Sequence, residues 1–546
     1  MEPYRKNFQP IIPEAIQDIG RVVFEKKHEC TIDSEIGALF PHLVPCSVLK
    51  GASATREHVE KKPLRVGVVF SGGPAPGGHS VIAGLFDCIK KWHADSSLIG
   101  FLNGPKGLLR NICKELSQID VDSVRNTGGF SLLGSGRTKI EAQEDIQKVI
   151  DTVKAQNLDA LAVIGGDDSN TDAAFFAEAF LQQGIRTCVI GLPKTIDGDL
   201  QSDDIPISFG FDTACKVYSE IIGNIGRDVS SAKKYYSFIR LMGRVASHIT
   251  LECALQTHPN LALISEEAAQ QELTLKALVV KIADLVEERA KSRIHYGLIL
   301  VPEGLVEHLV DMKHLIAELN EFFAPTHPLA SLLVACSKPG ERLDFVLDHI
   351  SERSSACLAL FPRHIAEQLL QERDPHGNVQ VSRIETERLL AGLVEAEIHL
   401  RSQKAGKEIP FVAQTGFCGY EGRSAFPSIF DCTYCYALGR LAGIFAIQKM
   451  TGFMAGFARL HESFASWEPL AVPLVSLLHF ERRKGAKKAV IQRVLVDLQG
   501  KPFSLFKNQC ASWRLTDSYQ QPGPMQFWGP EELTLPPCLT IRLGQG

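Results

Sequence analysis

Short hydrophobic runs alternate with amphipathic stretches along much of this chain. The runs at 64–70, 158–166 and 187–193 are rich in β-branched residues, and helical patterns at 81–92 and 171–183 follow the first two of them. Strands that alternate with helical patterns are typical of βαβ units and a parallel sheet.

The same alternation returns in a second series. Strand-like runs at 235–243, 260–267 and 295–304 are separated by helical patterns at 247–258 and 272–291. We therefore predict an α/β fold with two doubly wound, Rossmann-like parallel-sheet domains.

The pattern changes between 305 and 404, where long runs rich in Leu, Ala and Glu predict a helical insertion. Within it, residues 372–379 contain Pro375, Gly377 and Asn378 and predict a solvated turn that includes His376.

The remaining boundaries follow from these changes of pattern. Residues 1–60 lack the sheet rhythm and contain Pro10, Pro13, Pro41 and Pro45, so we expect an N-terminal extension that wraps the core. The expected domains are an α/β domain at 61–240, a second α/β domain at 241–304 and 405–470, and a C-terminal segment at 471–546 that packs back on the core.

Composition excludes several classes of protein. The 546 residues carry a net charge of −5 without a basic stripe, which argues against a nucleic-acid partner. No segment reaches about 18 consecutive apolar residues, and the N-terminus carries charges and prolines, so we expect neither a membrane span nor a secretory signal. The 14 cysteines are scattered, and the pair Cys432 and Cys435 predicts buried free thiols, in agreement with a cytoplasmic protein.

The first candidate for chemistry is the glycine-rich turn from Ser71 to His79, between a predicted strand and a predicted helix. Such a turn lets backbone N–H groups approach phosphate oxygens, and the helix N-terminus favours an anion. The turn is neither GxGxxG nor GxxxxGK[ST]. It predicts a phosphate cradle, with a tight turn that binds no ligand as the alternative.

The second candidate runs from Gly165 to Thr171 and contains Asp167 and Asp168 side by side. Adjacent carboxylates repel one another unless a cation or hydrogen-bond donors compensate them. Mg²⁺ commonly takes one or two carboxylates together with substrate phosphates and water, so Asp167 is a candidate ligand. The alternative is that Asp168 or Ser169 caps the following helix.

The third candidate runs from Pro193 to Asp199 and holds Lys194, Thr195 and Asp197. Charged side chains at this density are costly to bury unless they pair with one another or act on a ligand. All three loops follow predicted strands, where open α/β sheets place their ligands. We therefore expect them to converge on one crevice.

These three motifs are followed in order by KYYSFIRLMGR (234–244), VPEG (301–304) and YEGR (420–423). The series resembles the phosphofructokinase family, and most of all its long-chain pyrophosphate-dependent branch. The resemblance implies the phosphofructokinase fold. It also implies reversible phosphoryl transfer from inorganic pyrophosphate to the 1-hydroxyl of fructose 6-phosphate, which yields fructose 1,6-bisphosphate and phosphate.

The resemblance also implies roles for individual residues. Gly72 and Gly73 would contact pyrophosphate, Asp167 would hold Mg²⁺, Asp197 would accept the proton of the sugar hydroxyl, and Lys194 would stabilise the transferring phosphoryl group. The family match places the following residues at fructose 6-phosphate: Thr195, Ile196, Asp197, Met242, Gly243, Arg244, Glu303, Tyr420, Glu421, Gly422 and Arg423. Lys234 and Tyr235 would reach the sugar site of a neighbouring subunit, which implies a homodimer.

Two positions bear on the phosphoryl donor. ATP-using relatives typically carry glycine where this chain has Asp168 and Lys194. The Asp168 carboxylate would occupy the path of a nucleotide and repel its α-phosphate, whereas Lys194 adds a cation for the smaller donor.

Three alternatives stay open at this point. The first is an ATP-dependent phosphofructokinase, which Asp168 and Lys194 disfavour. The second is a non-catalytic regulatory subunit of a mixed oligomer, which has no need for the acids of the second and third loops. The third is a lipid or NAD kinase that shares only the short GGD turn.

Overall fold

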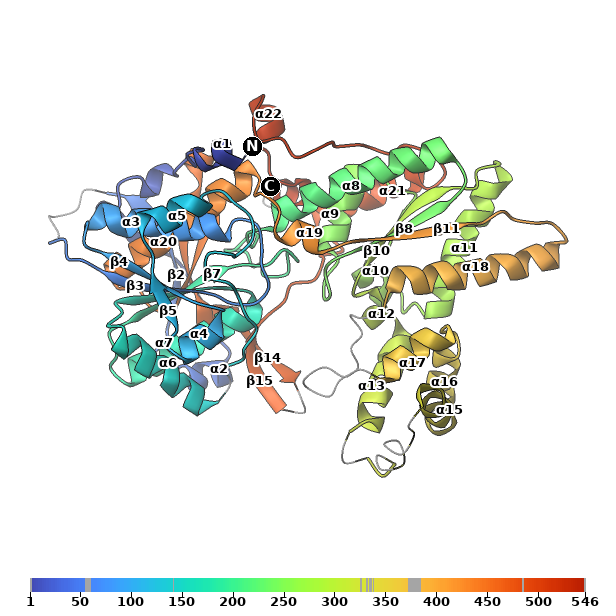
Figure 1. Ribbon diagram of the computed structural model, residues 1–546, viewed down its shortest axis with the longest axis horizontal. Helices are drawn as coiled ribbons and strands as arrows, with labels where there is room; N and C mark the ends of the chain where they lie inside the picture. The colour runs from blue at the N-terminus through green and yellow to red at the C-terminus, as the bar shows by residue number, and fades with distance from the viewer. Residues whose placement is uncertain are drawn as a thin grey trace. The chain divides into compact units, whose positions relative to one another are not determined.

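The computed structural model describes residues 2–54, 60–140, 142–324, 327–329, 332, 336, 338–371, 384–483 and 486–544 (Figure 1). The turn expected at 372–379 with His376 lies outside the described residues. The chain divides into two compact units. The first comprises Met1–Val217, Tyr420–Val494 and Met525–Gly546, and the second comprises Tyr218–Gly419 and Leu495–Pro524.

A nine-stranded sheet forms the centre of the first unit, in the order β1-β2-β13-β12-β7-β6-β3-β4-β5. The strands from β12 to β4 are parallel, and every residue of β6 and β7 is buried, which explains their unbroken hydrophobic runs. The strand bounds are β1 Val22–Glu29, β2 Ser47–Ser53, β3 Arg65–Phe70, β4 Ser97–Phe101, β5 Cys113–Glu115, β6 Ala160–Gly165, β7 Cys188–Pro193, β12 Phe453–Ala458 and β13 Glu468–Pro473.

The N-terminal extension contributes two of these strands. β1 and β2 pair antiparallel, and β2 continues the sheet by pairing with β13. The expectation that residues 1–60 lack sheet structure is therefore wrong. β1 lies at the sheet edge with a run of exposed charged residues, and this charge, common on edge strands, hides the alternating pattern.

Helices cover both faces of this sheet. α3 and α20 pack closely because each has a glycine at the contact. A side chain at Gly84 would collide with the carbonyl of Tyr436, and one at Gly439 would collide with the carbonyl of Val81. The two helices lie side by side in Figure 1. The bounds are α1 Glu2–Lys6, α2 Ser34–Leu39, α3 Gly78–Trp92, α4 Pro105–Leu109, α5 Gln118–Val124, α6 Gln143–Ala155, α7 Asp167–Gln182, α19 Tyr420–Arg423, α20 Ile429–Gln448, α22 Glu531–Thr534 and α23 Leu539–Gly544, with the 3-10 helices η1 Glu14–Ile16, η3 Phe464–Ser466 and η4 Leu474–Leu477.

A separate two-stranded sheet, β14 (Leu478–Arg483) and β15 (Ala486–Ile491), also belongs to the first unit. β15 packs on α7, and the Ile491 N–H donates to Thr171 Oγ1 at 2.9 Å. The next residue, Gln492, donates its N–H to Leu477 O at 3.0 Å. The end of β15 is thereby fixed beside the first turns of α7.

The second unit contains a four-stranded parallel sheet in the order β11-β8-β10-β9. The strands are β8 Tyr236–Leu241, β9 Leu261–Ala262, β10 Gly297–Pro302 and β11 Ala413–Cys418. Its helices are α9 His248–Thr257, α10 Ser265–Gln270, α11 Leu275–Lys291, α12 Leu305–His308, α13 Val310–Phe322, α15 Pro339–His349, α16 Glu352–Leu358, α17 Arg363–Gln371, α18 Thr386–Ala405 and α21 Lys501–Trp513, while α8 (Phe211–Ala232) begins in the first unit and ends here.

The helical insertion shares its core with this second sheet. One buried cluster joins Phe238 and Val301 of the strands to Leu315, Val346 and Leu389 of the insertion helices. The described part of 305–404 is therefore part of the second unit rather than a separate body.

The boundaries of the units differ from the expected ones. Residues 420–470, expected in the second α/β domain, belong to the first unit, because β12 pairs with β7 and α20 packs on α3. The first junction falls after Val217, inside α8, rather than at 240. The C-terminal segment is divided, with 495–524 in the second unit and the rest in the first.

Candidate active site

The glycine-rich loop joins β3 to α3 in the first unit. Gly72 has a φ of 88°, a conformation that favours glycine, and its N–H donates to Gly136 O at 2.9 Å. The Ser71 N–H donates to Ile164 O of β6 at 2.8 Å. The loop is therefore held on two sides, directly before the N-terminus of the 15-residue helix α3, whose dipole favours an anion.

The second loop joins β6 to α7. The N-cap of α7 is Gly166, so neither Asp168 nor Ser169 caps the helix, and Asp167 and Asp168 form its acidic first turn. Ser169 Oγ instead donates to Ser71 Oγ at 2.7 Å, which ties this loop to the glycine-rich loop. Asp167 is half-buried and Asp168 is exposed.

The third loop follows β7 and is tied to the second, because the Lys194 N–H donates to Gly165 O at 2.9 Å. Thr195 Oγ1 accepts from the Asp197 N–H at 3.1 Å. The Lys194 side chain is buried beside the glycine-rich loop, where a Cβ built on Gly72 would lie 3.0 Å from its Nζ. The structure thus brings the three predicted loops together within the first unit.

Burial and neighbouring charges shift two pKa values in this cluster. Burial lowers the pKa of Lys194 to about 8, although the Asp197 carboxylate opposes the shift. Burial and the carboxylates of Asp197 and Asp167 raise the pKa of Asp199 to about 7, against the opposing charge of Arg493. Cations and carboxylates at these loops are therefore close enough to act on one another.

Arg423 also lies at the glycine-rich loop. Its guanidinium occupies the space that a side chain at Gly73 would fill, and its Nε donates to Pro74 O at 3.5 Å. The guanidinium lies 5.2 Å from the ring centroid of Tyr420, and Glu421 and Gly422 complete the same short helix, α19. These four residues of the YEGR motif belong to the first unit, together with Thr195, Ile196 and Asp197.

The other predicted sugar residues belong to the second unit. Met242, Gly243 and Arg244 follow β8, and the Glu303 N–H donates to Leu241 O at 2.9 Å, so Glu303 lies beside them at the carboxyl ends of β8 and β10. Lys234 and Tyr235 precede the same strand. A strand of six residues separates the two groups by about 20 Å, so Lys234 and Arg244 lie at opposite ends of β8.

Two arginines near the loops were missed by the sequence analysis. Arg493 Nε donates to Asp167 Oδ2 at 2.7 Å. Arg137 Nη2 would lie 3.4 Å from a Cβ on Gly73, and its charge lowers the pKa of Lys194 further. Arg137 directly follows a second glycine-rich turn, Gly134-Ser135-Gly136, which is a signal visible in the sequence, and the Gly136 carbonyl accepts from the Gly72 N–H. The sequence around Arg493 has no comparable signal.

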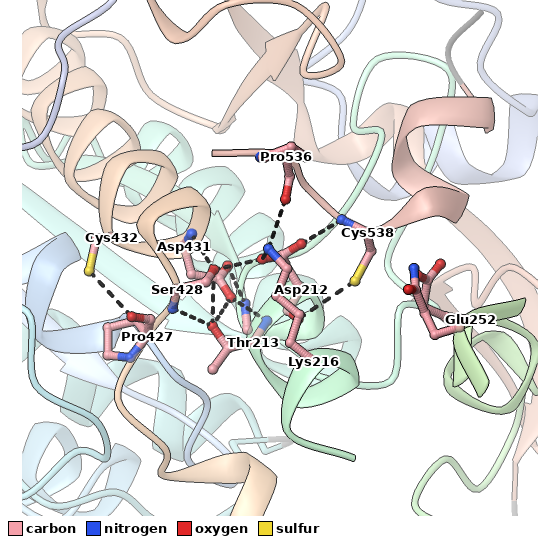
Figure 2. A network of polar contacts seen from close by, with 12 residues as sticks. Asp212, Thr213, Lys216, Glu252, Pro427, Ser428, Asp431, Cys432, Pro536 and Cys538 are labelled. Atoms are coloured by element: carbon pink, nitrogen blue, oxygen red, sulfur yellow. Dashed lines mark hydrogen bonds and ion pairs between the residues drawn. The ribbon is translucent and has the colours of Figure 1, made fainter. Parts of the chain in front are cut away.

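A buried polar network centres on Asp431 and Asp212 (Figure 2). Asp431, at the start of α20, accepts from the N–H groups of Gly210 and Thr213 at 3.0 and 2.9 Å and from Thr213 Oγ1 at 2.5 Å. Burial and the neighbouring Asp212 carboxylate raise the pKa of Asp431 to about 7. A Cβ on Gly210 would lie 2.8 Å from Ala75 Cβ, so the network supports the glycine-rich loop from behind.

Asp212 connects this network to the C-terminal segment. It accepts from Lys216 Nζ at 2.7 Å, from Ser428 Oγ at 2.6 Å and from the Cys538 N–H at 2.6 Å. Lys216 Nζ also donates to Pro536 O at 2.8 Å. Figure 2 shows side chains from the starts of α8 and α20 pointing toward one another, and the backbone of the final segment meets them at Pro536 and Cys538.

The predicted metal and thiol features can be located as well. Among the described residues, no group of three or more His, Cys, Asp or Glu side chains is arranged to hold a metal ion. Cys432 and Cys435 are buried in α20. In the described part of the chain, no helix combines the length and the apolar character that a membrane span requires.

Comparison with a solved structure defines the class of fold. The chain superimposes on the pyrophosphate-dependent phosphofructokinase from Nitrosospira multiformis with a TM-score of 0.55 and 16% identity, covering 83% of this chain and 93% of that one. The predicted α/β fold class, that of the phosphofructokinases, is confirmed.

Sequence comparisons identify the family. The family described as Phosphofructokinase matches residues 65–334. A protein of Treponema pallidum called pyrophosphate–fructose 6-phosphate 1-phosphotransferase is 51% identical, over 100% of this chain and 96% of its own length. A protein of the same name from Porphyromonas gingivalis is 44% identical, over 99% of this chain and 97% of its own length. The chain belongs to the phosphofructokinase family.

Proposed function

We propose that this chain reversibly transfers a phosphoryl group from inorganic pyrophosphate to the 1-hydroxyl of fructose 6-phosphate. The full-length relatives named for this reaction support the proposal. The structural observation that carries it is the position of Lys194, buried beside Gly72 of the glycine-rich loop and within the charge field of Asp197.

Phosphoryl transfer needs alignment and stabilisation of spreading charge more than covalent help from the protein. Lys194 supplies a cation beside the loop that would bind the donor. Asp197 is partly exposed in the third loop, where it would accept the proton of the sugar hydroxyl. The backbone at Gly72 and Gly73 and the dipole of α3 would bind the pyrophosphate oxygens.

The acids near Asp167 fit a magnesium ion. Mg²⁺ requires only one or two protein carboxylates when phosphates and water complete its octahedron, so the lack of a larger ligand group among the described residues is compatible with it. Asp167 would hold the ion, which when bound neutralises charge on the pyrophosphate. Burial, together with the carboxylates of Asp197 and Asp167, raises the pKa of Asp199, and a divalent cation would relieve the repulsion among these carboxylates.

The choice of pyrophosphate rests on Asp168 and Lys194. Asp168 is exposed in the first turn of α7, where its carboxylate would repel the α-phosphate of a nucleotide. The Lys194 ammonium lies beside Gly72 of the glycine-rich loop. An ATP-using relative typically has glycine in place of this lysine and would lack its charge.

For the sugar, we propose contacts from Thr195, Ile196 and Arg423 of the first unit and from Met242, Gly243, Arg244 and Glu303 of the second unit. Each group includes an arginine whose paired donors suit a phosphate. We also propose a cytoplasmic homodimer. Lys234 and Tyr235 lie about 20 Å from Arg244 along β8, too far to share one sugar site within the chain.

Mixing inactive variants tests the shared site. Lys234→Ala and Arg244→Ala chains should each lose activity, and their mixture should regain part of it, because one interface of the mixed dimer keeps an intact site. Full activity in a verified monomer would exclude shared sites.

The test of the function is an assay of the purified chain with fructose 6-phosphate and either pyrophosphate or ATP, each with and without Mg²⁺. We expect turnover with pyrophosphate and Mg²⁺. Turnover with ATP alone would support the ATP-dependent alternative. A folded chain that binds the sugar phosphate but turns over only after a partner is added would support the regulatory-subunit alternative.

A further inference from the structure

Arg493 reaches the second loop from a distant part of the chain. It follows β15, and the backbone on both sides of it is fixed: the Ile491 N–H donates to Thr171 Oγ1 at 2.9 Å, and the Val494 N–H donates to Asp199 O at 2.8 Å. Between these two anchors, Arg493 Nε donates to Asp167 Oδ2 at 2.7 Å. The guanidinium is therefore held at the carboxylate by a rigid local backbone.

Several negative charges surround this guanidinium. Asp199 and Asp168 act on its charge together with Asp167. The Arg493 side chain is 32% exposed and that of Asp167 is 20% exposed, so solvent reaches part of the pair. An ion pair that ligands can reach is one that a divalent cation or an anionic donor can rearrange.

We propose that Arg493 is an internal counter-ion of the donor site, which holds the Asp167 carboxylate before the donor arrives and then adds its positive charge to the binding of pyrophosphate. The proposal rests on the function proposed above. Arg493 is a positioning residue in this scheme, because it acts through Asp167 and through the electrostatic field at the loops.

This role has two effects of opposite sign. Before the donor binds, the guanidinium and a divalent cation compete for the same carboxylate, so Arg493 weakens the affinity of the free chain for the metal. The pyrophosphate anion, in contrast, gains from a cation beside its site. Removing the charge should therefore tighten metal binding and weaken pyrophosphate binding.

The experiment measures both affinities in the whole chain. Mn²⁺ binding is followed by electron paramagnetic resonance without pyrophosphate or sugar, and the KM for pyrophosphate is measured at saturating Mg²⁺. For Arg493→Ala we expect Mn²⁺ to bind more tightly by severalfold and the KM to rise roughly tenfold, the range for a lost charge-assisted hydrogen bond. Arg493→Lys, which keeps the charge, should fall between Arg493→Ala and the wild type.

Two variants guard against misfolding as an explanation. Arg493→Gln keeps most of the side-chain length without the charge and should match Arg493→Ala. Arg459→Ala removes an arginine of the same unit that pairs with Glu462 at the surface, and it should change neither affinity. A misfolded variant would lose Mn²⁺ binding instead of gaining it.

The outcomes separate this proposal from the proposed function. Weaker Mn²⁺ binding, or unchanged Mn²⁺ binding, in both Arg493→Ala and Arg493→Gln would overturn the counter-ion role. Tighter Mn²⁺ binding with an unchanged KM would overturn its part in pyrophosphate binding. A chain that turns over with ATP and ignores pyrophosphate would refute the proposed function, yet the Mn²⁺ measurement would still report on the pairing with Asp167.

Discussion

The first unit contains two clusters of buried or partly buried charge that are held in different ways. The donor cluster, defined here as Asp167, Lys194, Asp197, Asp199 and Arg493, is joined by side-chain charges, such as the pair between Arg493 and Asp167. In the network of Figure 2, carboxylates are bound largely by backbone N–H groups and hydroxyls.

This difference indicates that the network of Figure 2 supports the fold, whereas the donor cluster can act on a ligand. Backbone donors cannot move without moving a helix, so a carboxylate that they bind is fixed as part of the scaffold. A carboxylate that a long arginine side chain binds can exchange this partner for a ligand. Similar burial and similar residue types therefore lead to different expectations, and substitutions in each cluster should affect different properties of the protein.

The largest effect should come from Asp197, the proposed base. Asp197→Asn should lower kcat by roughly 10²-fold or more, because general-base catalysis is lost while the shape of the loop is kept. Binding of fructose 6-phosphate and the midpoint of urea denaturation should change little. Steady-state kinetics together with a binding titration test this, and a near-normal kcat would exclude Asp197 as the base.

The next largest effect concerns pH and Lys194. Burial lowers the pKa of this lysine to about 8, so the fraction that carries the required positive charge falls as the pH rises through this value. We expect kcat/KM for pyrophosphate to fall, at most about tenfold per pH unit, above pH about 8.

Titration of pyrophosphate itself must be separated from that of the lysine. Lys194→Arg provides the control, because a guanidinium stays charged throughout this range, so the variant keeps the titration of the substrate and of the other shared groups but loses that of the lysine. If the profiles of the two proteins are superimposable, Lys194 is not the group that titrates.

A smaller effect is expected at Asp168, the residue proposed to exclude nucleotides. Asp168→Gly removes an exposed carboxylate from the first turn of α7, so the ratio of kcat/KM for ATP to that for pyrophosphate should rise, by about tenfold if one charge contact decides it. Pyrophosphate use should itself decline because the site loses part of its geometry. An unchanged ratio would remove Asp168 as the determinant of donor choice.

Local patterns predicted much of this molecule. β6 and β7 were predicted because both their faces are buried and their hydrophobic runs are continuous. The charged loops after them were predicted because strand ends and motifs are adjacent in sequence. β1 was missed because an exposed, charged edge strand has no clear alternation.

Long-range contacts explain what could not be predicted. Arg493 lies 326 residues after Asp167, and only the packing of β15 on α7 brings the two together. Asp212 and Asp431 are unremarkable acids in the sequence and meet because α8 and α20 begin side by side. The same folding places Gly210 against the glycine-rich loop, a contact that no motif encodes.

The smallest expected effect on activity concerns the network. Asp431 has a pKa raised from 3.8 to about 7, so between these values the native protein holds a proton that the unfolded chain has released. Stability from this group is therefore greatest at low pH and is lost as the pH rises toward 7, by at most about 1.4 kcal/mol per pH unit. Asp431→Asn removes the titrating group and should show a flatter dependence of the urea midpoint on pH.

The comparison with the wild type is informative because all other titrating groups are shared by the two proteins. The difference in unfolding free energy between the wild type and Asp431→Asn should shrink between pH 5 and pH 8. The kcat of the variant should differ only severalfold from that of the wild type, because Asp431 supports the glycine-rich loop through Gly210 without touching the donor cluster. Parallel pH profiles would instead mean that the donors from Gly210 and Thr213 keep the Asp431 carboxylate ionised throughout. The two clusters would then differ in the mobility of their partners and not in the protonation of their acids.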